Sequence, residues 1–480
     1  MKTAPEENKV VEELVRPIAR AFARMGGKAY LVGGCVRDRV LGLEPKDYDL
    51  EVYGVAPDRI EPALRRFGPV NAMGKSFCIH RVQSPRSGDV HVDVSIPRRD
   101  SKAGSGHKGF IVTGDPDLSV KEACRRRDVT INSILEDPLT GEILDPFGGM
   151  ADIEKRVLRA TDAELFGEDP LRVLRLCQFA ARFECSIEPR TVEVCRSISG
   201  SLKELSRERV GEEWRKLLLK SRKPSIGISA VRDLGAAKVL HPELEALAGV
   251  PQEPEWHPEG DVWTHTLLAA DCAAEIVRRD RFAEESALII LFGALCHDFG
   301  KPATTEKDPG TGRIRSKAHA EAGVGPSANF LRGLKVGEDI EKKVRRIVLE
   351  HLNPLYLYDH RDEIKPSTVK RLAVRLFPAS FDELLAVAEA DYFGRTLELS
   401  GYPAGEWLRE QLKILELKSG GPSPILMGRH LVERGWDPGP EMGRVLKEVF
   451  ELQIEGAIDD FDSALARAEK IRSSRSRTGS

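Results

Sequence analysis

The sequence predicts an α+β protein in which a head of mixed strands and helices precedes an all-helical remainder. Two observations predict this class. Residues 1–150 combine short segments of alternating apolar and polar side chains, typical of half-buried strands, with amphipathic helical segments. After residue 150 the strand signals almost vanish, and helical patterns follow one another between loops rich in Pro and Gly. We expect a head at 1–150, a helical neck at 151–245, a helical domain at 246–400 and a helical tail at 401–480 with a disordered basic C-terminus.

The head begins with an amphipathic helix at residues 10–25, where apolar residues recur at helical spacing. A strand at 28–32 follows, ended by Gly33-Gly34, and a helix begins near Val36. Two further strands, at 48–52 and 90–96, alternate apolar with acidic or other polar residues. Each of these strands therefore has one face for a hydrophobic core and one face for a site.

Composition indicates a soluble globular protein, since 41% of the residues are hydrophobic and 31% are charged. The longest apolar run, residues 288–296, is much shorter than the roughly 20 residues that cross a membrane. The charged N-terminus lacks a signal-peptide core, and the eight cysteines form no CxxC pair. We therefore expect a cytoplasmic protein with no membrane partner. The net charge of −3 at first argues against a nucleic-acid partner.

Carboxylates gather on the polar faces of two predicted strands. Asp47, Asp49 and Glu51 share one face because strand side chains alternate with period two, and Asp93 lies on the polar face of the strand at 90–96. Converging carboxylates repel one another unless cations lie among them, and oxygen ligands favour Mg²⁺. Two such ions activate a hydroxyl and stabilise a leaving oxygen. For an arbitrary Asp-x-Asp, however, solvated edge-strand acids are the commoner interpretation.

The element upstream favours a site. Gly33-Gly34 follows a strand and precedes a helix, and twelve residues, 35–46, separate the pair from Asp47. Glycines at such a turn let backbone N–H groups approach phosphate oxygens closely. This order resembles the nucleotidyltransferase superfamily that includes DNA polymerase β. The segment LVGGCVRDRVLGLEPKDYDLEVYG, residues 31–54, is similar to the bacterial class II tRNA nucleotidyltransferase (CCA-adding enzyme) and poly(A) polymerase family.

The resemblance implies a polymerase-β-like head, with roles for several residues. Gly33 and Gly34 would hold the nucleoside triphosphate. The metal-binding carboxylates would be Asp47 and Asp49, with Asp93 as the third catalytic carboxylate and Mg²⁺ as the ion. Arg37 and Asp38 would support the phosphates and the loop.

Two further segments resemble the same family. In RRRDVTINSILEDPLTGEILDPFGGMADI, residues 125–153, Arg127 and Asp128 would contact the triphosphate and ribose, with Asn132 supporting the local geometry. A solvated charge run is the general alternative for such arginines. In EDPLRVLRLCQFAARF, residues 168–183, Asp169 and Arg172 are three apart on a predicted helix. In the family such a pair reads the base of CTP or ATP, whereas by itself it would be an ordinary ion pair.

The helix at 168–183 carries further candidates. Arg175 is a nucleotide-binding candidate, and Gln178 stands where many relatives carry arginine, which leaves open the nucleotides accepted. In the segment LSRERVGEEWRKLLL, residues 205–219, which resembles the family's neck, Arg209 is a possible contact, although we favour a helix-surface charge.

A second group of candidates lies in the helical part, where seven of the 11 histidines fall between residues 241 and 360. A lone buried histidine is usually a core residue. Imidazole and carboxylate ligands with open positions suit a transition metal that activates water against a phosphoester. Such ligands occur here in helical contexts, in the order His265, His297-Asp298, His319, His351 and Asp391.

This order resembles the HD phosphohydrolase superfamily, through the segments WHPEGDVWTHT (256–266) and LFGALCHDFGKPATT (291–305). In relatives this domain acts on 2′,3′-cyclic phosphodiesters and 2′-phosphates. Lys301 would contact the phosphate, and His257 is expected to be structural. The implied ligands of a divalent transition metal are His265, His297, Asp298 and Asp391, with His319 and His351 completing a second metal position.

The sequence therefore predicts a template-independent enzyme that adds C and A from CTP and ATP to the 3′ end of tRNA, with an additional HD phosphohydrolase activity. Rival interpretations are a poly(A) polymerase, an enzyme adding only CC or only A, an alarmone synthetase/hydrolase, in which the HD domain comes first, and a non-enzymatic RNA-binding protein. No obligate protein partner is readable. The segment 421–458 resembles the family's tRNA-gripping tail, although a packing role fits equally well.

The charge balance is compatible with an RNA partner if the basic surface is local. The arginines that would supply it are Arg125, Arg126 and Arg127 beside the expected nucleotide pocket, and Arg172, Arg175 and Arg182 on the neck helix.

Overall fold

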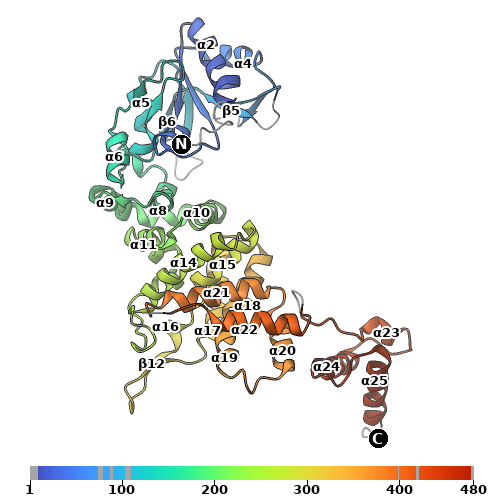
Figure 1. The fold of residues 1–480 in the computed structure, drawn as a ribbon. Coiled ribbons are helices and arrows are strands. Elements are labelled where there is room, and N and C mark those ends of the chain that lie inside the picture. The colour runs from blue at the N-terminus through green and yellow to red at the C-terminus, as the bar shows by residue number, and fades with distance from the viewer. Residues whose placement is uncertain are drawn as a thin grey trace. The chain divides into compact units, whose positions relative to one another are not determined.

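The computed structural model describes residues 9–73, 79–86, 90–102, 110–397, 399–417 and 421–476. The chain divides into two compact units (Figure 1). We call them the head unit, Met1–Leu217 with Ile226–Leu240, and the helical unit, Leu218–Ser225 with His241–Ser480. The predicted fold class is confirmed, because a mixed sheet with helices forms the head and helices dominate the remainder.

A seven-stranded mixed sheet forms the core of the head unit. The strand order in this sheet is β3 (Val70–Met73), β4 (Ile79–Gln83), β5 (His91–Ser95), β2 (Asp49–Tyr53), β1 (Lys28–Val32), β8 (Leu135–Glu136) and β9 (Ile143–Leu144). Within it, β2 pairs antiparallel with β1 and parallel with β5. A separate antiparallel hairpin is formed by β6 (Arg98–Lys102) and β7 (Phe110–Gly114).

Alternation of side chains gives this sheet two apolar faces. On one face Leu50 and Val52 are fully buried in a cluster with residues of α2 (Arg16–Arg24), α3 (Gly34–Val40) and α4 (Pro57–Leu64). On the other face Tyr30 and Tyr53 pack with Cys124 of α5 (Val120–Arg125). The helix predicted at 10–25 is present, with a π-helical first turn, η1 (Val11–Val15), before α2.

Helices follow the sheet, as predicted. Between residues 151 and 240, strand structure is limited to the short parallel pair β10 (Val157–Leu158) and β11 (Ser186–Ile187). The helical elements from residue 130 to 240 are η3 (Thr130–Asn132), α6 (Gly149–Lys155), α7 (Ala163–Phe166), α8 (Leu171–Phe183), α9 (Pro189–Ile198), η4 (Ser199–Glu204), α10 (Arg207–Lys220), α11 (Pro224–Asp233) and α12 (Ala236–Leu240).

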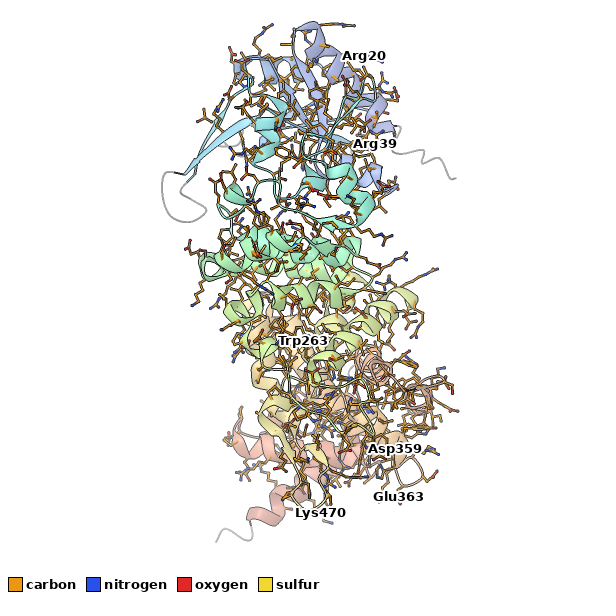
Figure 2. The ribbon with its side chains drawn as sticks, turned by 90° about the vertical axis from the view of Figure 1, so that its left-hand side faces the viewer. Arg20, Arg39, Trp263, Asp359, Glu363 and Lys470 are labelled. Carbon is orange, nitrogen blue, oxygen red and sulfur yellow. The ribbon has the colours of Figure 1, made fainter. Side chains whose placement is uncertain are left out.

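The core of the helical unit is built around α15, whose residues 287–296 are all buried. This burial explains why its sequence is apolar on every side. A Cβ at Gly293 would lie 2.8 Å from Val387 Cγ2, so this glycine permits the close approach of α15 (Glu284–Cys296) and α21 (Phe381–Gly394). Trp263, which Figure 2 labels, lies on α14 (Val262–Arg279) and is also buried. The elements are α13 (Pro242–Glu245), α14 (Val262–Arg279), α15 (Glu284–Cys296), α16 (Lys301–Thr304), β12 (Thr305–Lys307), β13 (Ile314–Ser316), α17 (His319–Gly333), α18 (Glu338–Glu350), α19 (Asn353–Asp359), α20 (Pro366–Leu376) and α21 (Phe381–Gly394).

The C-terminal helices are α22 (Pro403–Ile414), α23 (Gly428–Val432), α24 (Pro440–Ile454) and α25 (Phe461–Ser476). The last three share an apolar cluster that includes Leu431, Val445 and Ala468. We expected disorder in the basic C-terminus, but α25, which carries Lys470 (Figure 2), is helical through Ser476; residues 477–480 lie outside the described residues. Among the described residues, no helix has both the length and the hydropathy to cross a membrane.

Candidate active sites

The parallel pairing of β2 and β5 brings two candidate carboxylates of the head together. In this register Asp49 lies directly opposite Asp93. Asp47 was expected on the same strand, but it precedes β2, whose pairing begins at Asp49, and its side chain is 76% exposed. The backbone N–H of Asp93 donates to the carbonyl of Tyr48 at 3.0 Å, which joins the two segments beside Asp47. Asp49 and Asp93 thus lie on adjacent inner strands of the sheet, and Asp47 lies just before the first of them.

The electrostatics of this cluster favour a bound cation. Burial, followed by repulsion from Asp93 and Asp47, raises the pKa of Asp49 to about 6. Arg81 of β4 donates to both Asp93 oxygens at 2.7 Å, so it neutralises one of the carboxylates. The remaining oxygen donors suit a hard divalent ion, and the donor set therefore fits the expected metal. No sequence pattern indicated Arg81, because its role depends on the pairing of β4 with β5.

Glu51, on the same face of β2, has a different role. Its carboxylate is buried and accepts a hydrogen bond from the Tyr53 hydroxyl at 2.6 Å. Arg126 lies 3.3 Å from one carboxylate oxygen and Arg127 lies 3.7 Å from the other. Glu51 therefore holds two arginines of the 125–153 segment beside the sheet.

The glycine turn lies against one of these arginines. Gly33 has φ +73°, a backbone conformation that favours glycine, and it caps the N-terminus of α3. A Cβ at this position would lie 3.0 Å from Arg127 Nη1. Gly34 is the first residue of α3. The turn and the Arg127 side chain therefore lie against each other.

Arg37 and Asp38 of α3 are buried and bonded to each other, with the Arg37 Nε donating to Asp38 Oδ1 at 2.8 Å. Arg37 Nη1 donates to Asn132 Oδ1 at 2.6 Å, and Arg182 of α8 donates to Asp38 Oδ2 at 3.1 Å. The Arg37 guanidinium also lies 4.6 Å from the centroid of the Phe183 ring. These contacts connect α3 to η3 and α8, so both residues position the loop through the protein interior.

Asp128 is the centre of a second buried network. Asn132 Nδ2 donates to its Oδ1 at 2.9 Å, Arg175 Nε donates to its Oδ2 at 2.8 Å, and Arg175 Nη2 lies 2.7 Å from the same oxygen. Burial would raise the pKa of Asp128, but Arg175 and Asn132 outweigh burial and hold it below its ordinary value. Arg175 is therefore held by Asp128.

Asp169 and Arg172 do not pair as helix neighbours. Asp169 precedes α8, which begins at Leu171, and Asp169 Oδ1 accepts from the Leu171 N–H at 3.1 Å. Its Oδ2 accepts from Arg209 of α10 at 2.9 Å, so our expectation of a surface charge at Arg209 is wrong. Arg172 donates to the backbone carbonyls of residues 126 and 165, both at 2.6 Å. Gln178 is buried, and its Nε2 has no hydrogen-bond partner among the described residues.

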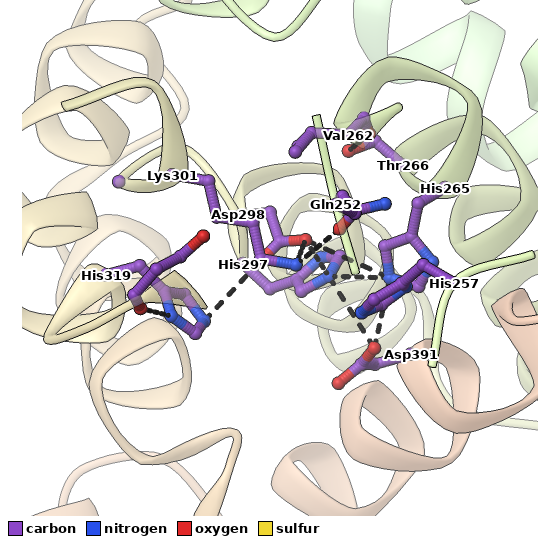
Figure 3. Close-up of polar contacts among 12 residues, drawn as sticks. Gln252, His257, Val262, His265, Thr266, His297, Asp298, Lys301, His319 and Asp391 are labelled. Atoms are coloured by element: carbon purple, nitrogen blue, oxygen red, sulfur yellow. Dashed lines mark hydrogen bonds and ion pairs between the residues drawn. The ribbon is translucent and has the colours of Figure 1, made fainter. Parts of the chain in front are cut away.

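In the helical unit, the predicted HD residues converge from separate helices (Figure 3). His265 lies on α14, His297 and Asp298 follow α15, and Asp391 lies on α21. His319 begins α17 and His351 follows α18. All six residues are at most 9% exposed. Two groups form, one of His265, His297 and Asp391 and one of Asp298, His319 and His351, each with ligand atoms within 4.8 Å of one another.

The four histidines share one orientation. Each Nδ1 lies 2.7–2.8 Å from an acceptor: Glu259 for His265, and backbone carbonyls for the others. Each Nε2 therefore presents a lone pair to the interior of the cluster. The Nε2 atoms of His265 and His297 are 3.3 Å apart, and His265 Nε2 is 3.0 Å from Asp391 Oδ1. Lone pairs of nitrogen and oxygen at this spacing fit shared divalent cations.

Burial and neighbouring charge set the protonation of this cluster. Burial, reinforced by His297 and His319, lowers the pKa of His351 to about 3, so this imidazole is neutral at neutral pH. Burial opposes ionisation of Asp298, but His297 and Lys301 outweigh it and hold its pKa well below the ordinary value. Lys301 Nζ lies 2.7 Å from Asp298 Oδ2 and donates to Gln252 Oε1 at 2.7 Å.

A cavity of about 260 Å³ opens onto this cluster. Its lining includes Asp298, Lys301, His319, His351 and Asp391, together with Gln252, Glu253, Trp256, His257, Ile314, Ser316, Leu352 and Arg395. Glu259, which we did not predict, accepts from His257 Nδ1 and His265 Nδ1 at 2.8 Å each. Glu259 lies in the segment 256–266, six residues before the candidate ligand His265. This acidic residue close to a candidate ligand is the sequence signal that could have indicated its role.

Comparison with protein families identifies three segments of the chain. Residues 29–159 match the poly A polymerase head domain, residues 185–247 match the model described as "Probable RNA and SrmB- binding site of polymerase A", and residues 262–393 match the HD domain. The chain is therefore an enzyme of the nucleotidyltransferase class that also carries an HD domain.

Solved structures agree over nearly the whole chain. The Bacillus stearothermophilus CCA-adding enzyme in complex with CTP is 21% identical, with a TM-score of 0.65 over 99% of this chain and 100% of that one. The Thermotoga maritima CCA-adding enzyme complexed with tRNA is 19% identical, with a TM-score of 0.57 over 98% and 96%. These likenesses show the fold. The chain thus combines a poly A polymerase head domain with an HD domain in the fold that these CCA-adding enzymes share.

Proposed function

We propose that the enzyme adds CCA to the 3′ end of tRNA, using CTP and ATP. The observation that carries this proposal is the register that sets Asp49 opposite Asp93 with Asp47 beside them, next to the Gly33 turn. The related structures were solved with CTP, ATP or tRNA, which supports these substrates. In the reaction the RNA 3′-oxygen bonds to the α-phosphorus, the bond to the bridging oxygen of the β-phosphate breaks, and pyrophosphate leaves.

Asp47 and Asp49 would hold Mg²⁺, which would supply activation of the attacking hydroxyl and stabilisation of the leaving oxygen, and Asp93, paired with Arg81, would be the third catalytic carboxylate. The turn at Gly33 and Gly34 would receive the triphosphate, because no Cβ obstructs the backbone there. Arg127, which lies against Gly33 and is tied to Glu51, would balance the phosphate charge. The Asp128 network and the Arg37–Asp38 pair would position this surface from behind.

Base selection would depend on Asp169 and Arg172. A carboxylate accepts from the exocyclic amino group that cytosine and adenine share, and a guanidinium donates to ring acceptors. Asp169 is held by Arg209 and Arg172 by two backbone carbonyls, so a nucleotide would have to share or replace these contacts. We also propose that the chain is organised as a head at 1–150, a neck at 151–245, an HD domain at 246–400 and a tail at 401–480.

The test is incubation of the full-length protein with tRNAs ending before the first C, after CC or at a complete CCA, and with each nucleotide separately. We expect addition of two C residues and one A, and then a stop. Repeated A addition would identify a poly(A) polymerase, and addition of only CC or only A would identify a partial enzyme. Asp49→Ala should abolish addition, and normal addition by this variant would contradict the carboxylate assignment.

We further propose that the HD site hydrolyses phosphoesters of the 2′,3′-cyclic or 2′-phosphate type. The inward Nε2 atoms of four histidines beside Asp298 and Asp391 carry this proposal. These six residues would hold a transition metal, which supplies activated water. The water oxygen bonds to phosphorus, the P–O bond to the ribose breaks, and the ribose oxygen takes the proton. His297→Ala should abolish hydrolysis and leave tRNA addition unchanged; hydrolysis at the wild-type rate would reject the site.

A further inference from the structure

The cavity over the HD cluster has an apolar wall that metal binding does not require. Trp256 lines it and is 53% exposed, and Leu352 lines it and is 41% exposed. Most tryptophan side chains are largely buried, because exposing such a large ring to water is unfavourable. Both residues lie on the rim of the same cavity as Lys301, His351 and Asp391. An exposed ring at the mouth of a polar site indicates a planar ligand group.

The loop that carries Trp256 is held in place. The Glu253 carboxylate accepts from the backbone N–H of Ile314 at 2.8 Å, and Glu255 pairs with Arg313 at 3.1 Å, so the β12–β13 hairpin anchors one side of the loop. The N–H of Trp256 donates to the carbonyl of Glu253 at 3.0 Å. On the other side, His257 is bonded to Glu259. Exposure of Trp256 is therefore a consequence of an anchored backbone, which reduces the entropy lost when a ligand stacks on the ring.

The same cavity offers cationic groups to a phosphate. Lys301 has three N–H donors, of which Asp298 and Gln252 account for two. Arg395 lines the cavity, and its Nη2 lies 3.6 Å from Asp391 Oδ1, which is longer than a hydrogen bond. Its buried Nε has no hydrogen-bond partner among the described residues. A buried donor without a partner is unfavourable, so a ligand acceptor here would stabilise the arrangement.

We propose that Trp256 stacks on the base of the phosphoester bound in this cavity and that Arg395, with Lys301, holds its phosphate. The proposal rests on the proposed phosphohydrolase function and adds to it the residues that contact the base and the phosphate. A volume of about 260 Å³ suits a single nucleotide or the terminal nucleotide of an RNA. Trp256, Gln252 and Glu253 precede the segment that matches the HD domain and Arg395 follows it, so these contacts are additions to the metal-binding core.

The same geometry predicts that the site does not discriminate among the four bases. Stacking depends little on which base is present, because every base has a π face. The polar side chains of the loop are already engaged: Gln252 by Lys301, Glu253 by the backbone of Ile314, Glu255 by Arg313 and His257 by Glu259. The four nucleoside 2′,3′-cyclic phosphates should therefore be hydrolysed with similar efficiencies.

The test compares adenosine 2′,3′-cyclic phosphate with 1-O-methylribose 2′,3′-cyclic phosphate, which is the same phosphodiester without a base, by ³¹P NMR with the full-length protein. Trp256→Ala should raise KM for the adenosine substrate roughly five- to a hundredfold, the range that one base stack supplies, and should leave KM for the baseless substrate unchanged. Trp256→Phe should retain most of the preference. Arg395→Gln should raise KM for both substrates.

The control variant is Phe377→Ala, which removes an aromatic ring that is 61% exposed and does not line the cavity. It should change neither KM. Equal losses on both substrates in Trp256→Ala would overturn the base contact, because a structural tryptophan affects both alike. If the wild type hydrolyses neither substrate, the phosphohydrolase proposal fails, and calorimetric binding of adenosine 2′-monophosphate against 1-O-methylribose 2′-phosphate still decides the base contact. Equal binding of these two ligands by the wild type would reject it.

Discussion

Replacing Asp49 by Asn should stabilise the metal-free protein at neutral pH while abolishing nucleotide addition. Asp49 faces Asp93 across the parallel β2–β5 pair, and burial, followed by repulsion from Asp93, raises its pKa from 3.8 to about 6. The folded protein therefore disfavours the ionised carboxylate when no cation is present. Asparagine keeps the shape of the side chain and removes the charge.

The magnitude follows from the pKa. A rise from 3.8 to about 6 corresponds to about 3 kcal/mol, at about 1.4 kcal/mol per pH unit. Because the folded-state pKa is raised, this penalty is fully present above pH 6 and disappears as the pH falls through 6 towards 3.8, where the carboxyl is protonated in both states. We therefore expect Asp49→Asn to raise the free energy of unfolding by up to about 3 kcal/mol at pH 7.5 and by about 1 kcal/mol at pH 4.5.

The assay is urea unfolding of chelator-treated protein at the two pH values, followed by a repeat with Mg²⁺. The matched control is Asp47→Asn, since the Asp47 side chain is 76% exposed and should change stability by less than about 0.5 kcal/mol. Mg²⁺ should stabilise the wild type more than Asp49→Asn at pH 7.5. An Asp49→Asn variant that is no more stable than the wild type at pH 7.5, or a gain that does not depend on pH, would refute this account of the carboxylate cluster.

Three further predictions concern the turn, the base-reading residues and the HD cluster. Gly33→Ala should destabilise the head by about 1–2 kcal/mol because of its positive φ, and it should also slow nucleotide addition because the new Cβ would lie 3.0 Å from Arg127. The control is Gly42→Ala, with φ +69° and nothing within 4 Å of the new Cβ, which should lose stability but not activity. Both variants are measured by unfolding and by primer extension. Asp169→Ala should reduce the discrimination of CTP and ATP against UTP in single-nucleotide extension. The free energy of unfolding should change by less than about 1 kcal/mol, because the ion pair of Asp169 with Arg209 is partly exposed. Unchanged nucleotide selection would show that Asp169 does not read the base. Glu259→Gln should lower metal affinity of the HD cluster roughly 10- to 100-fold in calorimetric titration, because Glu259 orients His265 through Nδ1, and should leave tRNA addition intact; unaltered affinity would show that this bond is dispensable.

Much of the fold and of the candidate sites was accessible from local sequence patterns. The short apolar segment ended by Gly33-Gly34 predicted β1, and alternation with period two placed β2 and β5 within a residue of their observed ends, because strand burial follows side-chain direction. The glycine pair predicted the turn before α3, and the order of histidines and aspartates predicted residues that converge in the HD cluster. These features depend on neighbours in the chain or on ligand chemistry that restricts residue type.

Tertiary structure alone decided which charges meet. Arg81 reaches Asp93, Arg209 reaches Asp169 and Glu51 binds Arg126 only because strand order and helix packing bring distant segments together. The sequence placed Asp169 and Arg172 on one helix face, whereas the helix begins after Asp169 and each side chain is engaged elsewhere. A charged side chain pairs with whatever the folded chain brings within about 3 Å, and sequence spacing does not encode that distance. The residue types of the candidate sites could therefore be read from the sequence, but the partners of their side chains could not.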